Sequence, residues 1–264
     1  MLLQQLSIVI TYFYMRGHIM LSDNDKQILA KLKTDYPEAY DFYERHEAEH
    51  KALLKRGCHD LRNIVTLLSG SYQLLGLTNP QLNLLPRFMT MGNDIKSLIQ
   101  AFNDIALFRY ASTISPEPVT LSELEKAVRV FISDNLFQAA DHINLISVSP
   151  CTTVNLDSSR LVSAIGCIIR NAVEASDFSS ETSSPVNITL MVTDHHNLCA
   201  EITNSGCCPS PDIADTMFEP FCTNRQEHLG LGLAIAAETA DAMGGTISWE
   251  HDNGITTFRL NVRI

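Results

Sequence analysis

The sequence predicts an α+β protein in two parts: a helical hairpin, then helices packed on one face of a mixed sheet. Apolar residues in the first part recur at alternating spacings of four and three, which is typical of helices. In the second part several short runs alternate apolar and polar residues, which is typical of strands. The stretch Ser115-Pro116-Glu117-Pro118 separates the two parts and is expected to be a linker. The length of 264 residues suits two modest domains.

The first part has one uninterrupted apolar stripe with the spacing of a coiled-coil or helical-bundle seam. Its members are Leu54, Cys58, Leu61, Val65, Leu68, Tyr72 and Leu75. The stripe ends at Leu77-Thr78-Asn79-Pro80, where Asn79 is a suitable cap and Pro80 a suitable first helical residue. A second stripe follows, with Pro86 near its start, so this helix either begins late or kinks there. It comprises Leu85, Phe88, Gly92, Ile95, Ile99, Phe102 and Ala106.

Two such helices joined by a short turn form an antiparallel hairpin, which cannot cover both of its apolar faces alone. Two hairpins from two chains make a four-helix bundle, so we expect a homodimer through residues 45–115. Residues 1–44 are expected to form an N-terminal segment, and 20–50 a helix that receives signals from a partner. The apolar run 6–14 is much shorter than the roughly 20 residues that span a bilayer, so we expect no membrane span.

The second part, residues 119–264, predicts elements in the following order. We expect a helix over 121–137, strands over 142–148 and 152–156, a helix over 157–176, and paired strands over 186–193 and 198–203. A polar loop of about two dozen residues begins at Asn204, which is long enough to indicate a functional loop. A helix over 231–243 and strands over 246–251 and 255–262 complete the chain. Asp252-Asn253-Gly254 between the last two strands is a strong hairpin signal.

Charge and cysteine content exclude some classes of protein. The chain has 30 acidic and 19 basic residues and a net charge of -11, which argues against a nucleic-acid partner. An odd number of cysteines, seven, without a CxxC pair indicates reduced thiols and a cytoplasmic protein. Zinc or redox sensing at Cys207, Cys208, Cys222 and His228 is a weaker alternative, because adjacent cysteines chelate a metal poorly.

His59 is the most informative single residue of the first part. It lies off the apolar seam, with Asp60 beside it and Asn63 one turn further along the same outward face. An exposed imidazole whose orientation a carboxylate fixes can act as a nucleophile. Basic residues surround it and suit phosphate or an acidic partner surface: Lys51, Lys55, Arg56 and Arg62. The plainer interpretation is a surface histidine on a solvated helix face.

Two clusters in the second part suggest an anionic ligand. Asn171 lies within an apolar helical run and needs a polar partner, which a hydrated Mg²⁺ on nucleotide phosphates would supply. Capping of a neighbouring strand is the alternative. Gly230 and Gly232 precede a predicted helix, where glycines allow close backbone approach and the helix N-terminus attracts anions.

Four motifs in this order resemble the H, N, F and G2 boxes of two-component sensor histidine kinases. They are His59-Asp60-Leu61-Arg62-Asn63, Asn171-Ala172, Phe218-Glu219-Pro220-Phe221 and Gly230-Leu231-Gly232-Leu233. The resemblance covers residues 45–264 and implies a dimerisation and histidine-phosphotransfer hairpin followed by a Bergerat-fold ATP-binding domain. It implies that His59 is the phosphoacceptor, that Asp60 assists it, and that Asn63 orients water for phosphate removal. It also implies that Asn171 coordinates Mg²⁺ and that Arg225, in the lid over residues 207–229, meets the nucleotide phosphates.

The sequence departs from this family at several positions. The run Asn204-Ser205-Gly206-Cys207-Cys208 stands where the family's G1 box reads Asp-x-Gly-x-Gly. Asn204 can still accept a hydrogen bond from adenine, but the loss of its charge weakens ATP binding about tenfold. Cys167 replaces an N-box asparagine and His228 the first G2 glycine. Related ATPases carry a glutamate where Cys167 stands, so transfer to a side chain is favoured over hydrolysis.

The sequence therefore predicts an ATP- and Mg²⁺-dependent histidine kinase. Its nucleotide would bind between Asn171, Asn204, Gly206 and the Gly230–Gly232 turn, and the ATP domain would swing on the linker towards His59. The phosphoryl group would pass to a receiver domain on a separate response regulator, docked around Arg56 and Arg62. The alternatives are an adaptor or phosphatase with a degenerate ATP domain, and an anti-sigma serine kinase.

Overall fold

The computed structural model describes residues 30–31, 33–176, 184–193, 197–206, 208–225 and 228–264. The chain divides into two compact units, Met1–Phe102 and Asn103–Ile264. Three expectations fall outside the described part: those on residues 6–14 and on Cys207, and those on the side chains of Lys51, Leu54 and Lys55.

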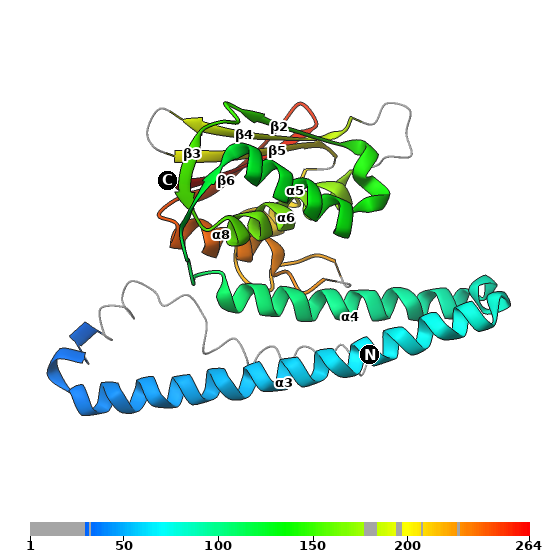
Figure 1. The fold of residues 1–264 in the computed structure, drawn as a ribbon, viewed down its shortest axis with the longest axis horizontal. Coiled ribbons are helices and arrows are strands. Elements are labelled where there is room, and N and C mark those ends of the chain that lie inside the picture. Colours follow the sequence, from blue (N-terminus) through cyan, green and yellow to red (C-terminus); the bar gives the residue numbers. More distant parts are fainter. Residues whose placement is uncertain (1–29, 32, 177–183, 194–196, 207, 226–227) are drawn as a thin grey trace. The chain divides into compact units, whose positions relative to one another are not determined.

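The first unit is a helical hairpin, as the two stripes predict (Figure 1). Helix α3 covers Pro37–Thr78, a short 3-10 helix η1 covers Pro80–Leu84, and helix α4 covers Pro86–Tyr110. Pro86 is thus the first residue of α4 and does not kink it, because the first helical position needs no backbone donor. The last turns of α4, from Asn103 onward, belong to the second unit.

The apolar seam of α3 divides into two rows. Val65 is buried against the hairpin partner, and the Tyr72 ring stacks on Phe88 with centroids 4.3 Å apart. The alternate seam members Leu61, Leu68 and Leu75 are 38%, 50% and 48% exposed. The sequence thus gives the helical period correctly, but only one edge of the stripe is covered inside the hairpin.

The second unit is a layered α/β structure whose five-stranded sheet has the order β2-β4-β5-β7-β6. The strands are β2 (Ile143–Val148), β4 (Val186–Thr193), β5 (Asn197–Ser205), β6 (Thr246–Asp252) and β7 (Ile255–Arg263). Strand β2 pairs with β4 in parallel, and the remaining neighbours are antiparallel. Asn253 and Gly254, both at positive φ, make the predicted turn between β6 and β7.

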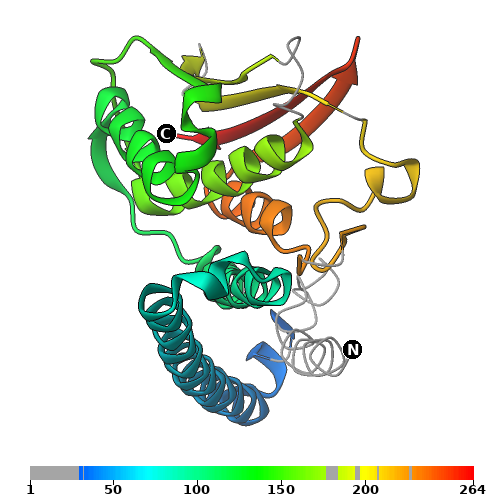
Figure 2. The same ribbon diagram turned by 90° about the vertical axis from the view of Figure 1, so that its right-hand side faces the viewer.

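Three helices lie on one face of this sheet: α5 (Leu121–Asn135), α6 (Ser158–Ala175) and α8 (Gly232–Ala242) (Figures 1 and 2). Their apolar sides and the inner sheet face form one core, in which α6 contributes Leu161, Ile165, Ile168 and Ile169 with no exposed area. The α/β sandwich that the sequence predicts is therefore present.

The structure corrects several boundaries. Residues expected to be linker form strand β1 (Glu117–Thr120), which pairs antiparallel with β3 (Thr153–Leu156). A 3-10 helix, η2 (Phe137–His142), follows α5. The predicted loop start, Asn204, lies within β5, and the following loop contains a short helix α7 (Pro211–Ala214). Strand pairing, which local composition does not reveal, extends β1 and β5 through these residues.

Candidate functional site

The His59 side chain is exposed on α3, at 69% of its free area. Its Nδ1 lies 3.3 Å from the Asp60 carboxylate and 3.3 Å from the Asn63 amide. The predicted trio therefore meets at one ring nitrogen. Because Nδ1 is engaged, the other ring nitrogen, Nε2, is the atom that remains to act as a nucleophile.

Arg62 does not belong to a solvated basic collar around His59. Its guanidinium donates to the Phe102 carbonyl oxygen, 3.3 Å away, and so faces α4 inside the first unit. The Nε atom is buried without a hydrogen-bond partner among the described residues. Arg56 is exposed, as expected, and is the described remainder of the basic group. Arg62 is half-buried and part of its side chain faces α4, a direction that its spacing from His59 does not predict.

The second unit encloses a cavity of about 450 Å³. Five of the predicted residues line it: Asn171, Asn204, Arg225, Gly230 and Gly232. Gly206 is not among the lining residues. Its backbone nitrogen donates to the Gly254 carbonyl, and a Cβ there would lie 2.4 Å from the Ala175 carbonyl oxygen. Gly206 thus permits the end of β5 to pass close to the end of α6.

Helix α6 positions Asn171 on the cavity wall. Its N-cap, Asp157, accepts a hydrogen bond from the Arg160 backbone nitrogen at 2.9 Å, which fixes where the helix begins. The second oxygen of Asp157 accepts from the Ser115 backbone nitrogen, also at 2.9 Å. With its apolar side in the core, the helix presents Asn171 to the cavity.

Asn204 lies on the cavity wall formed by β5 and is only 2% exposed. Its Nδ2 donates to the Ser205 carbonyl oxygen at 3.3 Å, so the amide oxygen is the group that can accept from a ligand. Thr256 and Phe258 on β7 complete this side of the cavity. Asn204 therefore offers one buried amide oxygen that can orient a planar ligand on this side of the cavity.

Gly230 makes a turn that other residues could not. Its φ is +68°, and a Cβ there would lie 2.7 Å from the Cys222 carbonyl oxygen. Its own carbonyl accepts from the Phe221 nitrogen, so the turn closes against the Phe218–Phe221 motif. Gly232 is the first residue of α8, whose N-terminal backbone donors therefore border the cavity and favour an anion.

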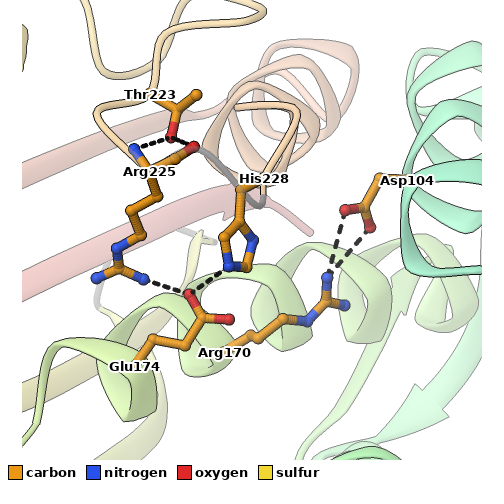
Figure 3. A network of polar contacts seen from close by, with 6 residues as sticks. All are labelled: Asp104, Arg170, Glu174, Thr223, Arg225 and His228. Atoms are coloured by element: carbon orange, nitrogen blue, oxygen red, sulfur yellow. Dashed lines mark hydrogen bonds and ion pairs between the residues drawn. The ribbon is translucent and has the colours of Figure 1, made fainter. Parts of the chain in front are cut away.

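Three charged residues that the sequence analysis did not single out also line the cavity: Asp104, Arg170 and Glu174. Arg170 pairs with Asp104 at 3.2 Å, and both side chains are nearly buried. The Glu174 carboxylate accepts a hydrogen bond from the Arg225 guanidinium, and His228 Nε2 lies 3.6 Å from the same carboxylate (Figure 3). Glu174 could have been found from sequence, since it lies one turn after Asn171. Asp104 could not, because it comes from a helix 66 positions earlier.

The described cysteines of the cavity are not arranged as a metal site. Cys167, Cys208 and Cys222 all line it, but the described residues contain no group of three His, Cys, Asp or Glu placed to hold a metal. Burial raises the pKa of the Cys167 thiol to about 12, so the side chain is uncharged where it lines the cavity. Cys167 itself supplies no carboxylate base at this position, although Asp104 and Glu174 line the same cavity and are paired with arginines.

The described residues contain no helix long and apolar enough to cross a membrane.

Comparisons with known proteins agree with this geometry. The family model described as histidine kinase-, DNA gyrase B-, and HSP90-like ATPase matches residues 156–264. The chain is 30% identical over 104 residues to the C4-dicarboxylate transport sensor protein DctB of Rhizobium meliloti, covering 39% of this chain and 16% of that protein. It is 24% identical over 217 residues to the sensory histidine kinase/phosphatase NtrB of Rhodobacter capsulatus, covering 78% of this chain and 60% of NtrB. The chain thus spans less than two thirds of either relative.

Among solved structures, full-length ShkA in complex with AMPPNP has the same fold. It superposes with a TM-score of 0.61 at 23% identity, over 80% of this chain and 45% of ShkA. The matched family, the sensor-kinase relatives and the cavity built by Asn171, Asn204 and the Gly230 turn lead to one assignment. Residues 156–264 match the histidine kinase-, DNA gyrase B- and HSP90-like ATPase family, and the chain is similar to sensor histidine kinases over a larger part of its length.

Proposed function

We propose that this protein is an ATP-dependent histidine kinase that phosphorylates itself on His59 and passes the phosphoryl group to a separate response regulator. The observation that carries the proposal is the exposed imidazole, engaged at Nδ1 by Asp60 and Asn63, in one chain with an ATPase-family cavity. A related ATPase without such an imidazole would have no internal acceptor.

The state of the imidazole favours attack through Nε2. In the tautomer that carries the proton on Nδ1, this N–H donates a hydrogen bond to Asp60 and the Asn63 amide nitrogen does not donate to it. The lone pair then lies on Nε2, and the carboxylate stabilises the positive charge that the ring gains. In the reaction the bond from Nε2 to the γ-phosphorus forms, the bond from that phosphorus to the bridging oxygen breaks, and ADP leaves. Asn63 is suited to dephosphorylation of the regulator, because its amide lies beside the ring and can orient the water that removes the phosphate.

Different residues of the cavity would bind the adenine and the phosphates of the nucleotide. Asn204 would accept the adenine amino group, and the Gly230 turn with the N-terminus of α8 would bind the phosphates. Asn171 supplies an amide oxygen of the type that Mg²⁺ accepts beside nucleotide phosphates. When bound, Mg²⁺ would neutralise charge on the phosphates, which is the main requirement of phosphoryl transfer.

Dimerisation, the partner and the location follow from the same proposal. The exposed row Leu61, Leu68 and Leu75 would pair with a second copy to complete a four-helix bundle. The phosphohistidine would then meet an aspartate of a receiver domain near Arg56. Both ATP and receiver domains are available in the cytoplasm, where we place the protein.

The test is an autophosphorylation assay with γ-labelled ATP and Mg²⁺ on the full chain. We expect an acid-labile, base-stable label on the wild type and on the control His142→Gln, which changes another exposed histidine. His59→Gln should carry no label. A wild-type protein that binds ATP but acquires no label under any Mg²⁺ condition would contradict the kinase.

Two observations favour a second candidate, an adaptor or phosphatase with a weakened ATP domain. Asn204 removes the charge that relatives use for adenine, and Arg225 is already paired with a carboxylate of its own chain. Such a protein would accept a phosphoryl group on His59 from a phosphorylated receiver domain without using ATP. Label appearing on His59 from the receiver and never from ATP would support it over the kinase.

A further inference from the structure

The wall of the nucleotide cavity carries two adjacent ion pairs with different partners. Arg170 and Glu174 are four residues apart on α6 and share one face of that helix. Arg170 forms an ion pair with Asp104, and the two side chains are 15% and 10% exposed. Arg170 thus gives its hydrogen bonds to Asp104 and acts on Glu174 through charge attraction alone, so the Glu174 carboxylate can accept hydrogen bonds from another cation.

That cation comes from the lid segment, defined here as the described residues 222–225 and 228. The Arg225 guanidinium donates to the Glu174 carboxylate, and His228 Nε2 approaches the same oxygen to 3.6 Å. Figure 3 shows both side chains directed at this carboxylate from the loop above α6. Thr223 supports the arrangement, since its hydroxyl accepts from the Arg225 backbone nitrogen at 3.1 Å.

The position of Glu174 makes this contact compete with the nucleotide. Glu174 lies one turn from Asn171, and both line the cavity with Arg225. Under the proposed function, Arg225 is the lid cation that meets the phosphates. A carboxylate that holds this arginine beside the phosphate position would compete with the phosphates for the guanidinium donors.

We propose that Glu174 is an internal latch: it holds Arg225 and His228 in the nucleotide-free protein and releases Arg225 to the phosphates. Glu174 is a positioning residue in this proposal and does not touch the reacting atoms. Only the release of Arg225 to the phosphates rests on the proposed function. The holding contact itself needs no nucleotide.

Nucleotide binding tests the release. We would measure the Kd of a fluorescent ATP analogue for the full-length wild type, Glu174→Gln, Arg225→Gln and the double variant. The control is Asp241→Asn, which removes one exposed charge from α8 outside the cavity. Glu174→Gln should tighten binding about two- to five-fold, the scale of a partly exposed ion pair, and Asp241→Asn should not.

The double variant separates a latch from simple repulsion between Glu174 and the phosphates. If Glu174 acts by holding Arg225, Glu174→Gln has little effect once Arg225 is absent. An equal tightening in the presence and absence of Arg225 would overturn the proposal. Weaker binding by Glu174→Gln would also overturn it, since Glu174 would then assist the ligand.

A second measurement tests the holding contact without nucleotide. Cys222 lies in the lid segment and is half-buried, with its sulfur 3.1 Å from the Thr216 hydroxyl. We expect Glu174→Gln and Arg225→Gln each to raise its alkylation rate at least two-fold, relative to the exposed Cys151 in the same chain. The double variant should react no faster than the single ones, and an unchanged rate in all variants would refute the latch. If Cys222 responds but no variant binds nucleotide, the contact stands and the proposed function fails.

Discussion

At the scale of single residues, the proposed function gives Asn204 the contact with adenine. It is almost fully buried, at 2% exposed, so a ligand atom that it contacts is shielded from water. A hydrogen bond to a charged acceptor is worth about twice one to a neutral acceptor in such a place. The residue therefore keeps the geometry of the site while lowering its strength.

We predict that Asn204→Asp tightens ATP binding about tenfold, because the carboxylate restores a charge-assisted bond. Titration calorimetry of wild type and variant measures it, with Asn204→Ala as the control that should weaken binding further. The nucleotide-free variant should unfold at lower temperature, since it buries an unpaired charge. A folded Asn204→Asp that binds no better than wild type would contradict the proposed orientation of the base.

Cys167 gives a second prediction at this scale. Burial raises the pKa of its thiol to about 12, so at pH 8 almost none of it is thiolate, the reactive form. We expect alkylation at pH 8 to label the exposed Cys151 and Cys208 and to spare Cys167 until the protein unfolds. The raised pKa also means that Cys167 stabilises the fold below pH about 9 and less as pH rises towards 12. Peptide mass spectrometry that finds Cys167 labelled in the native protein would contradict this environment.

Most of the residues that carry the site could be predicted from sequence, because motifs fix residue type and order. Asn171, Asn204, Arg225, Gly230 and Gly232 all line one cavity, as predicted. The ion pairs could not be predicted, since a pair such as Asp104 with Arg170 depends on how α4 and α6 pack. Arg62 illustrates the same point, because its direction depends on the neighbouring helix and not on its spacing from His59.

At the scale of elements, periodicity was sufficient for the helices and for most strands. Strand β1 was missed because Pro116 and Pro118 are turn-forming residues, and only the pairing with β3 makes Glu117–Thr120 extended. The same limit applies to the hairpin, where period alone does not separate the row that faces α4 from the row that is left exposed.

That exposed row gives a prediction for the helical element. Leu68 is 50% exposed at the middle of the row, so a glutamate there would place a charge within the proposed dimer core. We expect Leu68→Glu to shift the protein from dimer to monomer in analytical ultracentrifugation. Val130→Glu, at a 59% exposed position on α5, is the matched control and should leave the mass unchanged. A wild type that is monomeric at micromolar concentration would contradict the dimer.

At the scale of the whole molecule, the two compact units should respond to different variables. Nucleotide stabilises only the unit that contains the cavity, by about 2.7 kcal/mol at one hundred times Kd. Protein concentration stabilises only the unit that dimerises. Calorimetry of the full chain should therefore show two transitions, with nucleotide raising one by about 5–10 °C and dilution lowering the other. A single transition whose temperature depends on both nucleotide and protein concentration would contradict the prediction that the two units unfold independently.

Asp157 has a consequence for how the cavity can be disturbed. One of its oxygens defines the first turn of α6, and the other anchors the chain at Ser115, shortly after α4 ends. The side chain that holds the backbone at Ser115 is thus the same one that caps the helix carrying Asn171. Displacement of the connecting segment at Ser115 would therefore disturb the first turn of the helix that carries Asn171.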